Sequence, residues 1–241
     1  MEFIKIKTRI VNPPKDEIWD VLDNLKLQSG DIVFITSKIL AIHQGRCVPF
    51  GSVGKTELIK SESTHYLPFV AAWKDEIVLT ITQNTLIPSA GIDESNANNH
   101  YILWPMEQDK LCREIRAYLM KKNNLKNLAV VATDSHTTPM RMGVTGITTG
   151  LAGLRAVSDI RGNMDIFGRK LKHTRVNLID PLTSMAVLAM GEGSEQTPIV
   201  ILRNYENVIW DENGNTEPLK INPSEDLYQP LLDVFHRKGD K

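Results

Sequence analysis

The sequence has few of the features that would tie it to an oxidising compartment, a membrane or a nucleic acid. Its two cysteines, Cys47 and Cys112, lie far apart, which provides neither a disulfide framework nor the paired spacing of a zinc site. No apolar run approaches the roughly 18 to 20 residues needed to cross a bilayer. Lysine and arginine (28) nearly balance aspartate and glutamate (29), without a basic block. We therefore expect no membrane or nucleic-acid partner.

The composition is that of an ordinary globular protein, with 41% hydrophobic and 24% charged residues among 241. The first ten residues alternate polar and apolar types, which indicates a first strand rather than a signal peptide. We therefore expect a cytoplasmic protein with reduced thiols. No repeat, low-complexity segment or linker is visible, so we expect one domain over residues 1–241 with no clean internal boundary.

Hydrophobic periodicity predicts most of the regular elements. Helices are expected over residues 15–27, 108–122 and 182–190, the last following Asp180-Pro181. A final helix would be capped by Ser224, with its apolar side chains inward: Leu227, Leu231, Val234 and Phe235. Strands are expected over 32–36, 77–81, 129–133, 170–178 and 198–202, with a hairpin turn at Asn84-Thr85. Residues 57–76 have a helical pattern that Pro68 interrupts. Residues 51–56 end like a phosphate-binding loop, but Pro49 occupies the position of its first glycine, so we predict an ordinary loop.

The most informative stretch is 128–153, where a β-branched run ends at Asp134-Ser135. A buried strand that ends this way holds two oxygen ligands at the edge of a sheet, where open α/β arrangements bind ligands. Four glycines follow with spacings of three, four and three: Gly143, Gly146, Gly150 and Gly153. On a helix, continuing through 155–160, they would lie on one face. They indicate either close backbone packing, which is favoured, or a cradle for an anion.

Three loops carry acids next to other oxygen donors. They contain Asp93 with Asn96, Asp134 with Ser135, and Glu192 between two glycines. Such an oxygen-only set suits Mg²⁺ or Mn²⁺ better than zinc, and the metal would hold a nucleotide's phosphates.

Three further side chains complete the candidate catalytic set. Lys38 or Arg141 could supply positive charge to a transferring phosphoryl group. His136 could bind substrate or act as a base, although a histidine more often has a plain hydrogen-bonding role.

In these loops the sequence resembles the coenzyme F-420-0:γ-glutamyl ligase family. The resemblance extends from about residue 30 to 203 and rests on motifs that occur in the family's order. These are Gly30-Asp31 to Ser37-Lys38, Gly45-Arg46, Ala90-Gly91-Ile92-Asp93-Glu94-Ser95-Asn96, Thr133-Asp134-Ser135, Arg141-x-Gly143-x-x-Gly146, Gly150 to Gly153, Asp165-x-x-Gly168-Arg169 and Met190-Gly191-Glu192-Gly193.

The resemblance implies an α+β fold of mixed β-sheets with packed helices in two interlocked parts, and a homodimer. It also implies a GTP- and metal-dependent reaction that joins L-glutamate to a carboxylate of a deazaflavin precursor through an acyl phosphate. Asp93 and Asp134 would bind a first Mg²⁺ or Mn²⁺ ion, and Ser135 and Glu192 a second. The implied nucleotide contacts are Ser37, Asn96 and the 190–194 loop, including Gly191, Gly193 and Ser194.

The sequence departs from the family's pattern around the nucleotide and the acceptor. Residues 8–11 do not match the family's Gly-Leu-Pro turn, Ala41-Ile42 replace a lysine segment, Gln44 replaces a glutamate, and Thr137-Thr138 replace a Gly-Arg pair. ATP is therefore an alternative to GTP, and a folate-type pterin acceptor is the principal alternative to the deazaflavin. A non-catalytic nucleotide-binding module and a metal-dependent phosphohydrolase are further alternatives.

Overall fold

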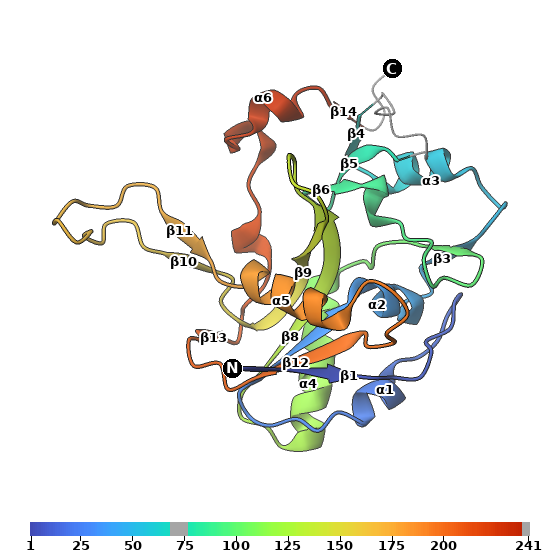
Figure 1. Cartoon of the computed structure of the whole chain (residues 1–241), viewed down its shortest axis with the longest axis horizontal. Coiled ribbons are helices and arrows are strands. Elements are labelled where there is room, and N and C mark those ends of the chain that lie inside the picture. The colour runs from blue at the N-terminus through green and yellow to red at the C-terminus, as the bar shows by residue number, and fades with distance from the viewer. Residues whose placement is uncertain (68–76, 238–241) are drawn as a thin grey trace.

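The structure, a computed structural model, describes residues 1–67 and 77–237 (Figure 1). Its largest sheet has the strand order β1-β12-β2-β8-β9-β13. These strands are β1 (Glu2–Ile6), β12 (Ile199–Arg203), β2 (Asp31–Thr36), β8 (Leu128–Thr137), β9 (Val144–Leu154) and β13 (Trp210–Asp211). Within the described sheet β2 and β8 pair in parallel, and the other neighbours are antiparallel.

Helices cover both faces of this sheet. Those that pack on one face are α1 (Trp19–Asp23), α2 (Ser37–His43) and α4 (Gln108–Asn123), and α5 (Asp180–Met190) packs on the other. Strand β2 shows the consequence, because Val33 and Ile35 point into the first core while Ile32 and Phe34 point into the second. All four side chains are fully buried. Burial on both faces explains why this strand has a continuous apolar sequence.

Smaller elements surround the main sheet. A second sheet contains β14 (His236–Arg237), β4 (His65–Tyr66), β5 (Leu79–Thr82) and β6 (Thr85–Pro88), near helix α3 (Lys55–Glu62). Two ribbons are formed by β3 (Cys47–Pro49) with β7 (His100–Ile102), and by β10 (Val157–Asp159) with β11 (Arg175–Asn177). The β10–β11 ribbon and its connecting loop extend from the body of the protein (Figure 1). Short helical turns are η1 (Ser89–Gly91), η2 (Glu217–Leu219), η3 (Pro223–Glu225) and α6 (Gln229–Leu232).

The predicted α+β class is confirmed, and several predicted elements are observed. Helices α4 and α5, strands β2, β8 and β12, and the hairpin between β5 and β6 lie where the periodicity placed them, within a few residues. Helix α4 ends where Asn124 adopts a left-handed conformation with φ of 50°, which asparagine tolerates well. Helix α3 ends at Glu62, before Pro68, and the rest of that predicted stretch, 68–76, lies outside the described residues. No helix within the described ranges is long and apolar enough to cross a membrane.

The helix predicted over 15–27 is shorter than expected. It begins at Trp19 and ends at Asp23. The carbonyl of Glu17, which would accept a hydrogen bond in a longer helix, instead accepts one from Arg9 Nη2 at 2.8 Å. This side-chain contact from a segment outside the helix lies directly before the start of α1.

The glycine-rich segment is a strand, not the predicted helix, and 155–160 likewise contains strand β10. The packing interpretation is correct for Gly146, Gly150 and Gly153, whereas a Cβ atom at Gly143 would meet nothing within 4 Å. A Cβ atom at Gly146 would lie 2.6 Å from the carbonyl oxygen of Thr183 in α5, and one at Gly150 would lie 2.8 Å from the carbonyl carbon of Gln108 in α4. The glycines allow helices to approach both faces of β9.

A β-bulge explains how glycines four positions apart meet opposite faces. Ala132 pairs with Gly150, but the next residue, Thr133, pairs with Thr148. Thr149 is thus an extra residue, and one extra residue reverses the alternation of side chains along a strand.

The C-terminal helix predicted from Ser224 is also wrong. The segment contains the turns η3 and α6, and three of the side chains expected to be inward are exposed: Leu227 at 85%, Leu231 at 66% and Val234 at 56%. Pro230 interrupts the predicted helix, because its missing N–H and its ring prevent a helix from continuing through it from Ser224; it lies instead in the first turn of α6, where proline is tolerated. The strand predicted over 170–178 is formed only at β11.

We expect Gly146→Ala and Gly150→Ala each to lower the free energy of unfolding by about 1–3 kcal/mol, because the added methyl group meets helix backbone. Denaturant unfolding measures this change. Gly54→Ala is the control, since a Cβ there meets nothing within 4 Å, and it should change stability by less than about 1 kcal/mol. Wild-type stability in both strand variants would contradict the packing interpretation.

Candidate functional site

The ends of four strands gather at one edge of the main sheet. Strands β1, β2 and β8 reach this edge with their carboxyl ends, and β12, which runs in the opposite direction, begins there. The chain segments next to these ends therefore meet. They surround a cavity of about 500 Å³ and include residues 8–11, 36–39, 133–135 and 190–198. The loop of residues 91–98 contributes a further wall.

The cavity brings together most of the side chains predicted from the sequence. The lining residues include all four predicted metal ligands: Asp93, Asp134, Ser135 and Glu192. They also include every predicted nucleotide contact: Ser37, Lys38, Asn96, Gly191, Gly193 and Ser194. The three acid-bearing loops therefore converge in space, as expected. Their chemical roles stay predictions.

Lys38 and Asp93 form an ion pair within the cavity. The Lys38 ammonium lies 2.7 Å from Asp93 Oδ2 and also donates to the backbone carbonyl of Ser95 at 2.7 Å. The other carboxylate oxygen of Asp93 accepts from the Ser95 amide at 2.7 Å and hydroxyl at 2.8 Å. Burial alone would raise the pKa of Asp93, but the charge and hydrogen bonds of Lys38 outweigh it and hold that pKa below its usual value.

Asp134 is the most deeply buried acid of the site. Burial raises its pKa to about 6, and the negative charge of Asp93 adds to this. Hydrogen bonds from the Trp104 indole, the Ser135 amide and the Ser37 hydroxyl oppose the shift. A buried carboxylate that lies near a second acid has a strong electrostatic preference for a cation.

Trp104 reaches Asp134 because Gly91 leaves room for its ring. A Cβ atom at Gly91 would lie 2.5 Å from the indole nitrogen, and Gly91 adopts a φ of +73° that favours glycine. The indole is 3% exposed, so its N–H group needs a partner inside the protein, and Asp134 provides it.

Glu192 is carried by a loop that several side chains hold in place. The Asn96 amide donates to the Gly193 carbonyl at 2.9 Å, and Glu195 turns back to accept from the Gly193 amide at 2.8 Å. The Thr197 hydroxyl donates to the Met190 carbonyl at 2.6 Å. Asn96 therefore connects two of the acid-bearing loops.

The arrangement of the three acids suits cations that bind together with a phosphate-bearing ligand. Burial raises the pKa of Glu192, Lys38 lowers it and Asp93 raises it further, so the three charges interact across the cavity. Over the described ranges, no three His, Cys, Asp or Glu side chains are grouped closely enough to hold a metal ion by themselves. Magnesium commonly takes only one or two protein carboxylates and completes its coordination with phosphate and water. The oxygen-only donor set fits that arrangement.

Two predicted catalytic residues lie away from the cavity. Arg141 is exposed in the loop between β8 and β9, and His136 is further along β8, where its ring nitrogens lie 3.1 Å from the Thr137 carbonyl and 3.3 Å from the Thr145 hydroxyl. Neither is among the lining residues. Their catalytic roles stay predictions that the cavity does not support.

The sequence interpretation missed three contributors to the site. Trp104 has no motif around it, although a buried indole always needs an acceptor. Glu195 has no sequence signal that distinguishes its role from that of the other residues in the glycine-acid loop. Residues 8–11 lacked the expected nucleotide turn, yet they line the cavity because β1 ends at the same edge as β2.

Comparison with known proteins identifies a family and relatives that match this chain. The sequence profile of the family described as F420-0:Gamma-glutamyl ligase matches residues 5–204. A protein of Methanopyrus kandleri named coenzyme F420:L-glutamate ligase is 29% identical, over 92% of this chain and 94% of its own. Proteins with the same name from Methanococcus maripaludis and Methanocaldococcus jannaschii are 33% and 28% identical, over 95% and 87% of this chain and 97% and 89% of their own.

These matches define the class of the protein, that of a ligase. More narrowly, the chain belongs to the F420-0:γ-glutamyl ligase family, whose profile covers most of its length.

We expect Asn96→Ala to loosen the loop that carries Glu192, because the loop loses its hydrogen bond to the neighbouring loop. Hydrogen–deuterium exchange of residues 191–197 should become several-fold faster. Asn99→Ala is a matched control. The backbone of Asn99 also has a left-handed conformation, but within the described part of the chain its side-chain amide makes no hydrogen bond. Equal exchange in the two variants would show that Asn96 does not hold the loop.

Proposed function

We propose that this protein is a nucleotide- and metal-dependent γ-glutamyl ligase that acts on a coenzyme F420-0-type precursor in the cytoplasm. It would join the amine of L-glutamate to a carboxylate of that precursor. The observation that carries the proposal is the meeting of Lys38 with Asp93, Asp134 and Glu192 around one cavity, within the span that matches the family. The names of the relatives support the choice of acceptor.

The first step would be phosphoryl transfer. An acceptor carboxylate oxygen attacks the γ-phosphorus of GTP or ATP, the bond to the bridging oxygen breaks, and NDP leaves. The product is an acyl phosphate. Lys38 lines the cavity and carries a positive charge that could stabilise the transferring group, while Ser37, Asn96 and Ser194 at the cavity wall are the proposed nucleotide contacts.

The second step would form the amide. The amine of glutamate attacks the acyl carbon, phosphate leaves, and the amine loses a proton. Phosphate is a far better leaving group than the oxide of a free carboxylate, which is why activation is needed. The cavity contributes by holding the two reactants next to each other, and such positioning can supply a large part of the rate enhancement.

Two divalent ions, Mg²⁺ or Mn²⁺, would complete the site. Asp93 with Asp134 and Ser135 with Glu192 are the residues that would hold them, since each pair offers oxygen donors at the cavity wall. When bound, the ions would supply positive charge against the phosphates. In the absence of a ligand, Lys38 balances the charge of Asp93.

We further propose that the protein forms a homodimer. Large apolar side chains are exposed on the β8–β9 loop, on the β10–β11 ribbon and on α5: Met140, Met142, Ile166, Phe167 and Leu188. Exposed apolar groups of this size are typical of surfaces that another protein covers. Sedimentation at several protein concentrations tests this assignment.

The decisive experiment incubates the protein with glutamate, Mg²⁺ or Mn²⁺, GTP or ATP, and either coenzyme F420-0 or tetrahydrofolate. We expect a γ-glutamyl product from F420-0 with one NDP and one phosphate per amide. A product from tetrahydrofolate would support the folate alternative. Nucleotide binding without turnover would support a non-catalytic module, and phosphate release without an acceptor would support a phosphohydrolase.

We expect Asp134→Asn to lower kcat at least about 100-fold, because it removes a negative charge from the proposed metal site while keeping the side-chain shape. Steady-state kinetics with circular dichroism measures the loss and checks the fold. Asp226→Asn, at the distant C-terminal segment, should leave kcat unchanged. Near-normal activity of the Asp134 variant would remove that residue from the catalytic site.

A further inference from the structure

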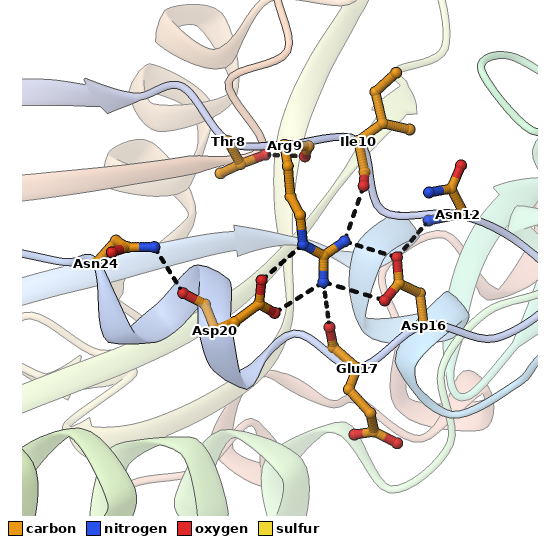
Figure 2. Close-up of polar contacts among 8 residues, drawn as sticks. All are labelled: Thr8, Arg9, Ile10, Asn12, Asp16, Glu17, Asp20 and Asn24. Atoms are coloured by element: carbon orange, nitrogen blue, oxygen red, sulfur yellow. Dashed lines mark hydrogen bonds and ion pairs between the residues drawn. The ribbon is translucent and has the colours of Figure 1, made fainter.

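One wall of the cavity is built from chain without regular secondary structure. Strand β1 ends at Ile6 and α1 begins at Trp19, and residues 8–11 between them line the cavity. Irregular segments depend on side chains for hydrogen-bond partners that a helix or sheet would otherwise provide. Here the main partner is the side chain of Arg9, which Figure 2 shows between Asp16 and Asp20.

The guanidinium group of Arg9 is fully engaged by the protein. Nε and Nη2 bind the two carboxylate oxygens of Asp20 at 2.7 and 2.8 Å, and Nη1 and Nη2 bind those of Asp16 at 2.7 and 3.1 Å. Nη1 also donates to the Ile10 carbonyl at 2.9 Å, and Nη2 to the Glu17 carbonyl at 2.8 Å. A guanidinium group has five N–H donors, and six acceptors surround this one. Arg9 therefore has no donor left for a ligand.

Further contacts close the segment on both sides of Arg9. The backbone amide of Asn12 donates to the Asp16 carboxylate at 2.9 Å. The backbone amide of Thr8 donates to the Gln196 carbonyl at 3.1 Å, which connects the wall to the Glu192 loop. Val11 is 7% exposed and packs in the first core. The segment is therefore fixed at each end, and Arg9 organises the part between.

The charges make this arrangement depend on Arg9. Hydrogen bonds from the guanidinium lower the pKa of both Asp16 and Asp20, and aspartate is ionised at neutral pH even without such a shift. Without Arg9 they would repel each other, and the carbonyls of Ile10 and Glu17 would lose their donor. Arginine suits this position because its planar group binds two carboxylates in a fixed geometry, which lysine does not.

We propose that Arg9 is a positioning residue for substrate binding, which holds residues 8–11 as the wall against which the uncharged part of the nucleotide lies. This inference rests on the proposed function. The acids and Lys38 lie at the other walls, where the phosphates would bind, whereas the wall segment offers no free charge and brings Ile10 and Val11 to a cavity that Ile39 and Ile42 also line. Such a surface suits a base and sugar.

The test compares Arg9→Met, Arg9→Lys and the matched control Arg161→Met. Arg161 also binds one carboxylate through two nitrogens, that of Asp159, but it lies in the β10–β11 ribbon. We expect Arg9→Met to raise KM for the nucleotide about tenfold or more, while kcat at saturating nucleotide and KM for glutamate change less than about twofold. Arg9→Lys should show a smaller increase, and Arg161→Met none.

A direct binding measurement separates this inference from the proposed function. A fluorescent GTP or ATP analogue is titrated into each variant at a temperature where circular dichroism shows it folded. Weaker binding in Arg9→Met with partial recovery in Arg9→Lys supports the inference. Wild-type affinity in folded Arg9→Met overturns the inference while leaving the proposed function intact. A rise in KM for glutamate and a fall in kcat that are as large as the rise in KM for the nucleotide overturn the inference as well. Absence of nucleotide binding by the wild-type protein overturns both.

Discussion

Parallel pairing between β2 and β8 is the constraint on which the rest of the site depends. Parallel neighbours end at the same edge of a sheet, so Thr36 and Thr133 lie side by side and the residues that follow them are brought together. The antiparallel strand β12 begins at this edge, and β1, antiparallel to β12, ends there. Segments from distant parts of the sequence therefore surround one cavity.

The polar groups of this cavity hold one another in place before any ligand binds. Trp104 supports Asp134, Lys38 neutralises Asp93, and Asn96 connects the loop of Asp93 to that of Glu192. Each contact joins two different segments, so the geometry of the acids is a property of the whole sheet edge. Such preorganisation reduces the rearrangement needed when charge is transferred.

The wall formed by residues 8–11 illustrates a different solution to the same problem. Here the chain has no ladder or helix to satisfy its backbone, and one guanidinium group supplies donors to two carboxylates and two carbonyls. The same contacts include the carbonyl of Glu17, directly before α1. Local sequence pattern favoured a longer helix, over residues 15–27, than the one observed.

The amino-acid sequence by itself determined the positions of the strongly patterned elements, α4, α5, β2, β8 and β12, because burial of apolar side chains sets their periodicity. It also identified the acids at Asp93, Asp134 and Glu192, since oxygen donors in loops after buried segments are visible in the order of residues. Tertiary structure alone decided that the glycine-rich segment is a strand. The spacing of the glycines also suits a helix, and only the packing of α4 and α5 against β9 shows why glycine is needed at Gly146 and Gly150. Tertiary structure alone decided the contacts of Trp104 and Arg9 as well, since each depends on a partner that only the assembled sheet brings within reach.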